Sequence, residues 1–303
     1  MRDRTADYDY QRLLEEEREH YSEIEVTAEL KEGGVHASSA WQYYWERVAR
    51  RIAPSEFGDL AAVLAPLGRA GRTIEVLSLG SGYSGHEIDL ARRLPRPYRV
   101  RCTDINEELF ERAKQVARTE TLGLEFEVAD LNHLSIDRGR YDLILAHASL
   151  HHVINLEQLF EQVAAGLSPQ GIFHVVEVTG ENRKLIWDEN QRYANALLDL
   201  LPGEVTNGVR LAVSAREEGM EGIRQQDILP LLHARFSPAF ELRHGAFMRF
   251  ICTHHALAAA LDPGQVDRRR LLDFLLQSDE CAVRHQVLRP LELWGVYRPR
   301  GAA

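Results

Sequence analysis

The sequence predicts an α/β fold: a Rossmann-like, mostly parallel seven-stranded sheet with helices on both faces, plus an N-terminal helical extension and helical insertions. The first observation is the stretch 73–94, where a β-branched apolar run stops at a glycine-rich turn and gives way to helical periodicity. The second is the alternation of such runs with helical patterns up to residue 180, which is typical of parallel sheets with covered faces. The third is the length of 303 residues, which leaves room for elements beyond this core.

The expected elements follow from local composition and periodicity. Seven runs are typical of strands: 74–79, 98–103, 124–128, 141–146, 172–178, 240–244 and 291–297. Helical patterns between or after them cover 88–94, 106–118, 156–167 and 266–276, and the Ser-Pro-Gln-Gly segment 168–171 is expected to be a turn. Three more helices are expected before the sheet, over 11–30, 38–53 and 57–67.

The glycine turn after the first strand indicates a ligand site. Its letters G-S-G-Y-S-G, with Gly80, Gly82 and Gly85, match the dinucleotide fingerprint G-x-G-x-x-G. A Cβ there would block a positive φ and the close approach of a ligand to backbone N–H groups. The turn therefore predicts a ligand at the carboxyl end of the first strand, although purely structural glycine turns also occur between a strand and a helix.

A carboxylate at the end of the second strand narrows the class of ligand. Asp104 follows the glycine turn by about 20 residues, the position at which an acidic side chain binds ribose hydroxyls. A carboxylate suits this task because it only accepts hydrogen bonds and can serve two hydroxyls at once. The third strand ends at Ala129-Asp130-Leu131, and the fourth ends in the segment HASLHHV, which begins at His147.

Taken in order, these segments resemble the class I S-adenosylmethionine-dependent methyltransferases that act on small molecules. The resemblance covers roughly residues 73–180. VLSLGSGYSG resembles the first motif of the family, TDINEELFERAKQVA the second, and VADLNHL the segment whose acid holds adenine. YDLILAHASLHHVINLEQLFEQVAAGLSPQGIF resembles the fourth strand, its helix and the turn into the fifth strand. Their order and spacing together are more specific than any one of them.

The resemblance implies ten cofactor-binding positions: Gly80, Ser81, Gly82, Tyr83, Gly85, Asp104, Ile105, Asp130, Leu131 and His147. The glycine turn would pass beneath the methionine part of the cofactor. Asp104 would bind the ribose diol, with Ile105 packing on adenine. Asp130 would accept a hydrogen bond from the adenine amino group, with the Leu131 N–H facing the ring, and His147 would lie near the sulfonium.

Two positions depart from the family pattern. The family usually carries an acid two residues before the first glycine, where this chain has Ser78. The third glycine often follows directly after the position of Tyr83, whereas here that place is Ser84 and the glycine is Gly85. Both departures concern the geometry of the methionine pocket and not its location.

The implied chemistry predicts candidate catalytic residues. Methyl transfer from a sulfonium is an in-line displacement that needs no metal, so the enzyme supplies positioning, desolvation and a base for a protonated nucleophile. Histidine is the natural base near neutral pH, and His152 is favoured, with His151 and His147 as the other candidates. One of the pair 151–152 would otherwise cap or pack against the next helix. His254 and His255 lack further ligands at zinc-type spacing, so no metal is expected.

Composition limits the partners and the compartment. The net charge of −10 and pI of about 5.7 argue against a nucleic-acid substrate. Three scattered cysteines suggest free thiols in a reducing compartment. The N-terminus lacks the apolar core of a signal peptide, and no apolar run reaches 18 residues, so a cytoplasmic protein without a membrane segment is expected.

The chain is expected to divide into three parts. Residues 1–70 form a helical N-terminal extension, or lid; 71–180 form the S-adenosylmethionine-binding Rossmann-like core; and 181–303 complete the sheet and carry inserted helical substrate-binding segments. In the first part, the acidic block 15–17 is interpreted as a solvated helix face. The aromatic group within 41–45 either packs between helices or covers the cofactor and substrate.

The sequence therefore predicts an S-adenosylmethionine-dependent methyltransferase that acts on a small-molecule acceptor at oxygen or nitrogen. The glycine fingerprint leaves a NAD(P)-dependent oxidoreductase as an alternative. A non-catalytic binding protein with a methyltransferase-like fold is a second alternative, supported by Ser78. The acceptor and the oligomeric state are left open.

Overall fold

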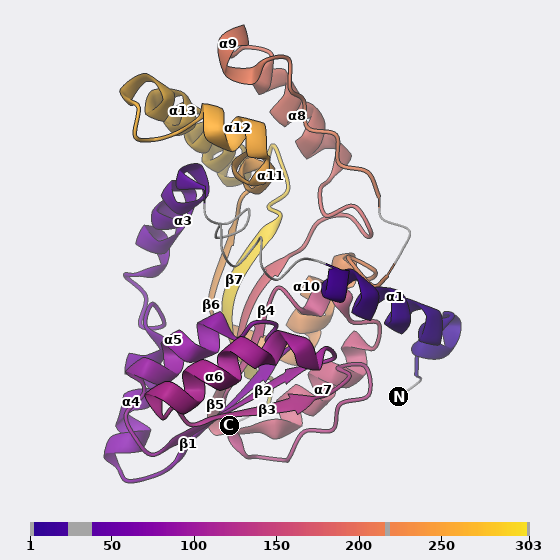
Figure 1. Cartoon of the computed structure of the whole chain (residues 1–303), viewed down its shortest axis with the longest axis vertical. Helices are drawn as coiled ribbons and strands as arrows, with labels where there is room; N and C mark the ends of the chain where they lie inside the picture. Colours follow the sequence, from indigo (N-terminus) through magenta and orange to yellow (C-terminus); the bar gives the residue numbers. More distant parts are fainter. Residues whose placement is uncertain (1–2, 24–37, 216–218, 302–303) are drawn as a thin grey trace.

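The computed structural model describes residues 3–23, 38–215 and 219–301. Its centre is a seven-stranded sheet in the order β3-β2-β1-β4-β5-β7-β6. The strands are β1 (Ile74–Leu79), β2 (Tyr98–Asp104), β3 (Leu124–Val128), β4 (Tyr141–His147), β5 (Leu167–Val178), β6 (Phe236–His244) and β7 (Glu292–Pro299). All seven expected strands are present in a Rossmann-like α/β arrangement (Figure 1).

The register of the parallel strands brings three chain segments to one edge of the sheet. Leu79, the last residue of β1, lies beside Thr103 of β2 and Ala146 of β4. The residues that follow these positions therefore leave the sheet side by side. This edge is where a doubly wound sheet binds its ligand, because the chain connections diverge there.

The sheet is mixed, whereas the sequence predicted a mostly parallel one. The pairs β3–β2, β2–β1, β1–β4 and β4–β5 are parallel, but β7 pairs antiparallel with both β5 and β6. The last strand enters between two earlier ones after a long helical segment. Its direction depends on where that segment returns the chain, and the alternation of local patterns does not reveal this.

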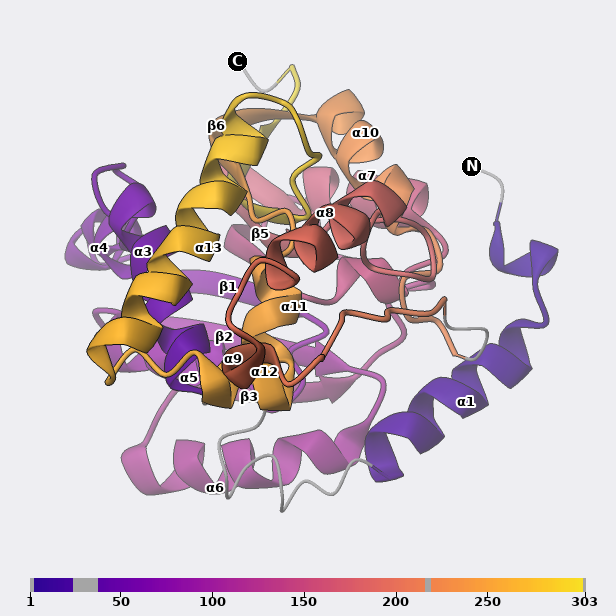
Figure 2. The ribbon, with the colours of Figure 1, turned by 90° about the horizontal axis from the view of Figure 1, so that it is seen from above.

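Helices cover both faces of the sheet. The helices α4 (Leu60–Arg69), α5 (Gly85–Arg93) and α6 (Phe110–Glu120) lie on one face, and α7 (Leu156–Gly166) and α10 (Gln225–Arg235) lie on the other (Figures 1 and 2). Helix α10 was not predicted, because Pro230 interrupts its pattern and its apolar residues do not share one helix face. Strand β5 begins at Leu167 and includes 168–171, where a turn was expected; its pairing with β4 shifts register there.

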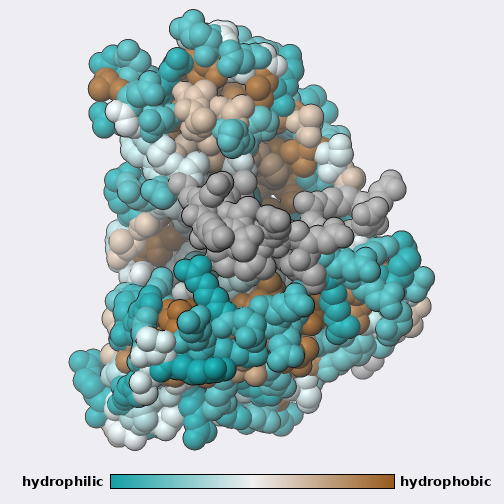
Figure 3. All heavy atoms as spheres, in the orientation of Figure 1, coloured by the Kyte–Doolittle hydropathy of each residue, from teal (hydrophilic) through white to brown (hydrophobic). Residues whose placement is uncertain are grey.

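A second group of helices forms a cap beyond the ends of β6 and β7 (Figure 1). It contains α3 (Ser39–Ile52), α8 (Asp188–Leu198), α9 (Gly203–Thr206), α11 (Met248–Thr253), α12 (His255–Ala260) and α13 (Val266–Arg284). Hydrophobic residues are visible at the narrow region between this cap and the mainly hydrophilic lower part of the molecule (Figure 3). Among the described residues, no helix is both long and apolar enough to cross a bilayer.

The expected lid is only partly supported. Trp41 and Tyr44 are buried in the cap, where the Tyr44 hydroxyl contacts His244 and Glu292. These aromatic residues therefore pack between helices and do not line the cofactor cavity. By contrast, α1 (Tyr10–Glu23) lies along the ligand edge of the sheet; the rest of the predicted helix 11–30 is outside the described residues.

Candidate active site

One cavity of about 380 Å³ lies at the carboxyl edge of the parallel strands. Its volume is within the range of small-molecule sites. It is lined by nine of the ten expected cofactor positions: Gly80, Ser81, Gly82, Tyr83, Asp104, Ile105, Asp130, Leu131 and His147. The tenth, Gly85, begins α5 and is not among the lining residues. His152 also lines the cavity, whereas His151 is buried behind it.

The glycine turn has the geometry that its sequence predicted. Gly80 has a φ of +63°, and a Cβ built on it would lie 2.6 Å from the Cβ of Ser149. A side chain at this position would therefore meet both backbone strain and the β4–α7 connection. Ser84, at the place where the family often has a glycine, takes up the left-handed conformation itself, with a φ of 55°.

Gly80→Ala is expected to weaken S-adenosylmethionine binding at least tenfold and to lower the melting temperature, because the new Cβ has no room. Gly85→Ala is the matched control: Gly85 has no positive φ, and a Cβ there meets nothing within 4 Å. Calorimetric titration and thermal melting of both variants would test this. Equal cofactor affinity in the two variants would contradict the steric argument.

The absence of an acid at Ser78, the first departure from the family pattern, is compensated by a carboxyl group from another element. Ser78 donates its hydroxyl hydrogen bond to Glu87 Oε1 over 2.6 Å, and both side chains are buried. Burial raises the pKa of Glu87, which the Ser78 hydrogen bond opposes. A carboxyl group thus lies beside the end of β1, supplied by α5 in place of the strand itself.

Asp104 braces the turn from the next strand. Its Oδ2 accepts a hydrogen bond from the Gly82 N–H at 2.9 Å, and its Oδ1 accepts one from the Asn106 N–H at 3.0 Å. Burial raises the pKa of this carboxyl, and the backbone hydrogen bonds oppose the rise. A carboxylate has about four acceptor positions, so roughly two remain for other donors.

The N-terminal helix reaches the predicted adenine position. Tyr10 of α1 donates its hydroxyl hydrogen bond to Asp130 Oδ2 over 2.6 Å, and Asn132 Nδ2 lies 3.1 Å from the same hydroxyl. His133 Nδ1 also contacts Asp130 Oδ2, at 2.8 Å. The carboxylate that the sequence predicted for adenine therefore has three protein partners in this structure, including the Asn132 backbone N–H.

Three histidines lie together at the end of β4, where His147 contacts both His86 and His174. His147 Nε2 contacts His174 Nδ1 at 2.9 Å, and the rings of His147 and His86 are 4.6 Å apart. Burial and the neighbouring rings hold the pKa of His147 well below its usual value, and they lower that of His174 to about 3. Both imidazoles are therefore neutral near neutral pH.

Folding stability is expected to fall as the pH falls from about 6.5 towards 3. The unfolded chain gains a proton on His174 below its ordinary pKa of 6.5, whereas the folded chain gains it only near 3. This one site contributes about 1.4 kcal/mol per pH unit in that window. His174→Asn should therefore show a shallower loss of stability between pH 7 and 5 in urea unfolding. His233→Gln, at an outer histidine, is the control, and equal slopes in wild type and His174→Asn would refute the assignment.

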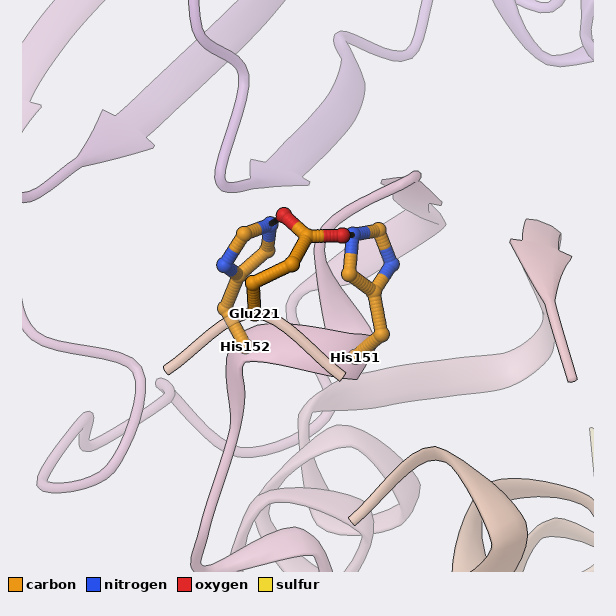
Figure 4. Close-up of side chains that lie close together, drawn as sticks. All are labelled: His151, His152 and Glu221. Carbon is orange, nitrogen blue, oxygen red and sulfur yellow. Dashed lines mark ion pairs between the residues drawn. The ribbon is translucent and has the colours of Figure 1, made fainter. Parts of the chain in front are cut away.

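The other side of the cavity holds a cluster of histidines and carboxylates. His151 Nδ1 lies 2.7 Å from Glu177 and His152 Nδ1 lies 2.6 Å from Glu17. The Nε2 atoms of both imidazoles lie 3.5 Å from the two carboxylate oxygens of Glu221, which stands between the rings (Figure 4). Five chemically active side chains thus meet next to the predicted methionine pocket.

The cluster is strongly polarised. Burial alone would lower the pKa of His152, but the ion pair with Glu17 and the nearby carboxylates raise it to about 9. Burial likewise opposes ionisation of Glu177, yet His151 and the N–H groups of Leu150 and Val178 lower its pKa. The carboxylates around the two imidazoles therefore stabilise a positive charge, either on an imidazole ring or in the space between the rings.

Sequence reasoning found the two histidines and missed their partners. Glu17 was interpreted as part of a solvated face, but it is buried and its Oε2 accepts a hydrogen bond from the Met220 N–H at 2.7 Å. Glu177 is the second-last residue of β5 and Glu221 lies in the segment before α10, with no motif to mark either. Only the position of Glu177 carried a signal, since it lies at the same carboxyl edge as the histidines.

The cavity, the glycine turn and the acidic residues at the ends of β2 and β3 are typical of an α/β domain that binds a nucleoside cofactor. Residues 76–171 match the family model of the methyltransferase domain. Residues 76–171 therefore form a methyltransferase domain, and the cofactor of this domain is S-adenosylmethionine. This match argues against the NAD(P)-dependent alternative.

Curated relatives are similar over the same part of the chain. A highly reducing polyketide synthase of Alternaria alternata is 29% identical over 136 residues, which are 42% of this chain and 4% of that protein. Polyketide synthase 19 of Gibberella fujikuroi is 26% identical over 126 residues, which are 40% of this chain and 5% of that protein. The chain thus corresponds to a small part of these relatives.

Solved structures resemble the chain more broadly. A S-adenosylmethionine-dependent methyltransferase from Mesorhizobium loti has a TM-score of 0.46 at 17% identity, covering 88% of this chain and 100% of that one. Geranyl diphosphate C-methyltransferase from Streptomyces coelicolor has a TM-score of 0.45 at 11% identity, covering 74% of this chain and 72% of that one.

Proposed function

We propose that this chain is a methyltransferase that transfers the methyl group of S-adenosylmethionine to oxygen or nitrogen of a small molecule. The observation that carries the proposal is a single cavity with the expected cofactor positions on one side and His152, with its carboxylate partners, on the other. Transfer to the acceptor is an in-line displacement at the sulfonium methyl, and this step itself needs no metal. The net charge of −10 supports a small molecule over a nucleic acid.

The acceptor must lose a proton if it is a hydroxyl or a protonated amine. His152 lines the cavity, and its two ring nitrogens face the carboxylates of Glu17 and Glu221. Either carboxylate can accept a proton from the imidazole. Because its pKa is raised to about 9, His152 is protonated near neutral pH and can take a proton from the acceptor only after its own proton passes to Glu17 or Glu221. We therefore assign His152, together with these carboxylates, the main part in activating the acceptor. His147 lines the cavity too, but its contact with His174 turns one ring nitrogen away from an acceptor.

The cofactor and the activity have separate tests. Calorimetry should detect binding of S-adenosylmethionine and none of NAD or NADP. Incubation with methyl-labelled S-adenosylmethionine and a panel of phenols, amines and carboxylates should then give labelled product. Binding of the cofactor without product from any acceptor would favour the non-catalytic alternative, to which Ser78 gave support.

The methylated atom has a second candidate, an activated carbon of an acyl chain. The matched curated relatives are polyketide synthases, which build such chains. His152, which faces the cavity with Glu17 at its other ring nitrogen, would then take the proton that such a carbon loses. A β-ketoacyl thioester in the acceptor panel, with the product analysed by NMR, distinguishes carbon from oxygen and nitrogen methylation.

The N-terminal helix is proposed to close the site during transfer. It places Tyr10 at Asp130 and Glu17 at His152, and Leu13 packs with Ile154 and Met220. Deleting residues 1–30 is therefore expected to leave a folded protein with much reduced turnover, because the sheet begins only at residue 74. Circular dichroism and steady-state kinetics would test this, and unchanged kinetics would show that the segment only packs against the core.

A narrower variant separates the lid from general packing. Tyr10→Phe removes the hydroxyl that donates to Asp130 and keeps the ring. If the hydroxyl competes with adenine for Asp130, S-adenosylmethionine should bind this variant at least as tightly as it binds the wild type.

The expected cytoplasmic location stays a prediction, consistent with Cys102, Cys252 and Cys281 being free thiols.

A further inference from the structure

We propose that His151, His152 and Glu221 form a site for one divalent first-row transition ion, such as Zn²⁺, beside the cofactor cavity. The sequence predicted no metal, because methyl transfer needs none and His254 and His255 lack further ligands at zinc-type spacing. The fold brings one ligand atom from each side chain to within 4.8 Å of the others. The role of the ion rests on the proposed function, but its binding does not.

The spacing of these atoms fits shared coordination better than direct hydrogen bonds. Each Nε2 atom lies 3.5 Å from a Glu221 oxygen, beyond the usual hydrogen-bond length of about 2.7–3.2 Å. Two ligands that are each about 2.0–2.1 Å from a tetrahedral ion lie roughly 3.3 Å apart. The nitrogen–oxygen spacing is therefore near that of ligands around an ion, and a pair at the widest spacing of 4.8 Å must close by about 1.5 Å.

The far side of each imidazole is arranged as in metal-binding histidines. Nδ1 of His151 contacts Glu177, and Nδ1 of His152 contacts Glu17. A carboxylate that accepts the Nδ1–H fixes the tautomer, so that the Nε2 lone pair points to the ion and becomes more basic. Glu177 and Glu17 are themselves fixed by backbone N–H groups of Leu150 and Met220.

The ligand types select the ion. Two imidazole nitrogens and one carboxylate suit Zn²⁺ or Fe²⁺, whereas Mg²⁺ and Ca²⁺ prefer sites made only of oxygen. Three protein ligands leave at least one position for water or substrate, as in catalytic zinc sites. The ion would therefore bind an acceptor oxygen or nitrogen next to the cavity and lower its pKa, in place of a proton on His152.

The test is metal binding by the full chain. After treatment with a chelator and dialysis, the protein should bind one Zn²⁺, measured by elemental analysis, and Co²⁺ should give visible absorption bands typical of nitrogen and oxygen ligands. Glu221→Gln should weaken binding at least a hundredfold, and Glu17→Gln should weaken it by about 10–100-fold through His152. A large excess of Mg²⁺ should not displace the ion.

His233→Gln is the matched control, because His233 pairs with Glu241 at 2.5 Å outside the cluster. It should bind Zn²⁺ as the wild type does. The metal site would be overturned if the wild type bound no stoichiometric Zn²⁺, or if Glu221→Gln bound it equally well. The cluster would then consist only of the ion pairs His151–Glu177 and His152–Glu17. Methyl transfer is measured separately with and without chelator: equal rates would overturn the role of the ion, and product without any ion would leave the proposed function intact.

Discussion

Replacing Asp104 by alanine is expected to weaken S-adenosylmethionine binding by about a hundredfold or more. Asp104 is the last residue of β2, and its carboxylate lines the cavity and is proposed to accept hydrogen bonds from both ribose hydroxyls. Hydrogen bonds to charged groups contribute about 1.5–3 kcal/mol each, so the loss of two accounts for this factor. The variant also loses the contact with the Gly82 N–H, which holds the glycine turn in place.

Two further variants isolate the carboxylate. Asp104→Asn keeps the shape and one acceptor oxygen, so its affinity should lie between those of wild type and Asp104→Ala. Asp89→Ala removes an exposed carboxylate on α5 and should leave the affinity unchanged. Calorimetric titration measures all three. An affinity of Asp104→Ala within threefold of wild type would exclude the ribose-binding role.

The second large effect is expected from His152→Ala. Because His152 lines the cavity and is proposed to activate the acceptor, turnover should fall at least tenfold, and a general base contributes about 10²–10⁴-fold in rate. Cofactor affinity should barely change, since the predicted contacts to S-adenosylmethionine come from other residues. The comparison of kcat with the dissociation constant of the cofactor separates this outcome from misfolding.

His151 and His147 are the comparison sites. His151→Ala should also lower turnover, because it frees Glu177 and disturbs the contact with Glu221. His147→Ala should have the smaller effect on rate, since its pKa is held low and its ring contacts His174 and His86. Near-normal turnover in all three variants would mean that the reaction proceeds by proximity and orientation alone.

The two large effects fall on different halves of one cavity. Asp104 and Asp130 lie where the nucleoside is predicted, and His152 lies with Glu17 and Glu221 where the acceptor is predicted. A variant in the first half should change affinity for the cofactor, and one in the second half should change turnover. The reverse result would show that the cofactor binds in the half with His152 and the acceptor in the half with Asp104.

Much of the cofactor half followed from the sequence, for a physical reason. In a parallel sheet, residues after consecutive strands leave at the same edge, so strand ends can be matched before any coordinates exist. Gly80, Asp104 and His147 were placed together in this way, and the register of β1 with β2 and β4 agrees. The positive φ of Gly80 follows from the tight turn that glycine favours at this position.

The sequence was less informative about which side chains of the N-terminal helices are buried, and against what. The acidic block containing Glu17 has the composition of a solvated face, and the dense aromatic group near Trp41 suits either a lid or helix packing. In the structure Glu17 is buried at His152, and Trp41 is buried in the cap. Side-chain type alone did not distinguish these outcomes, because both depend on what packs against the helix.

The sequence by itself determined the strand–turn–helix core, the seven strands and the edge at which the cofactor is predicted to bind. The hydrophobic period and the turn chemistry are local properties, and the alternation of strands with helices favours parallel pairing in the core. Only the tertiary structure decided that β7 runs antiparallel, that Tyr10 contacts Asp130, and that Glu17, Glu177 and Glu221 surround the two histidines. These groups come from α1, β5 and the segment before α10, and their meeting depends on how the whole chain packs. A carboxylate shows no sign in the sequence of which distant imidazole it will face.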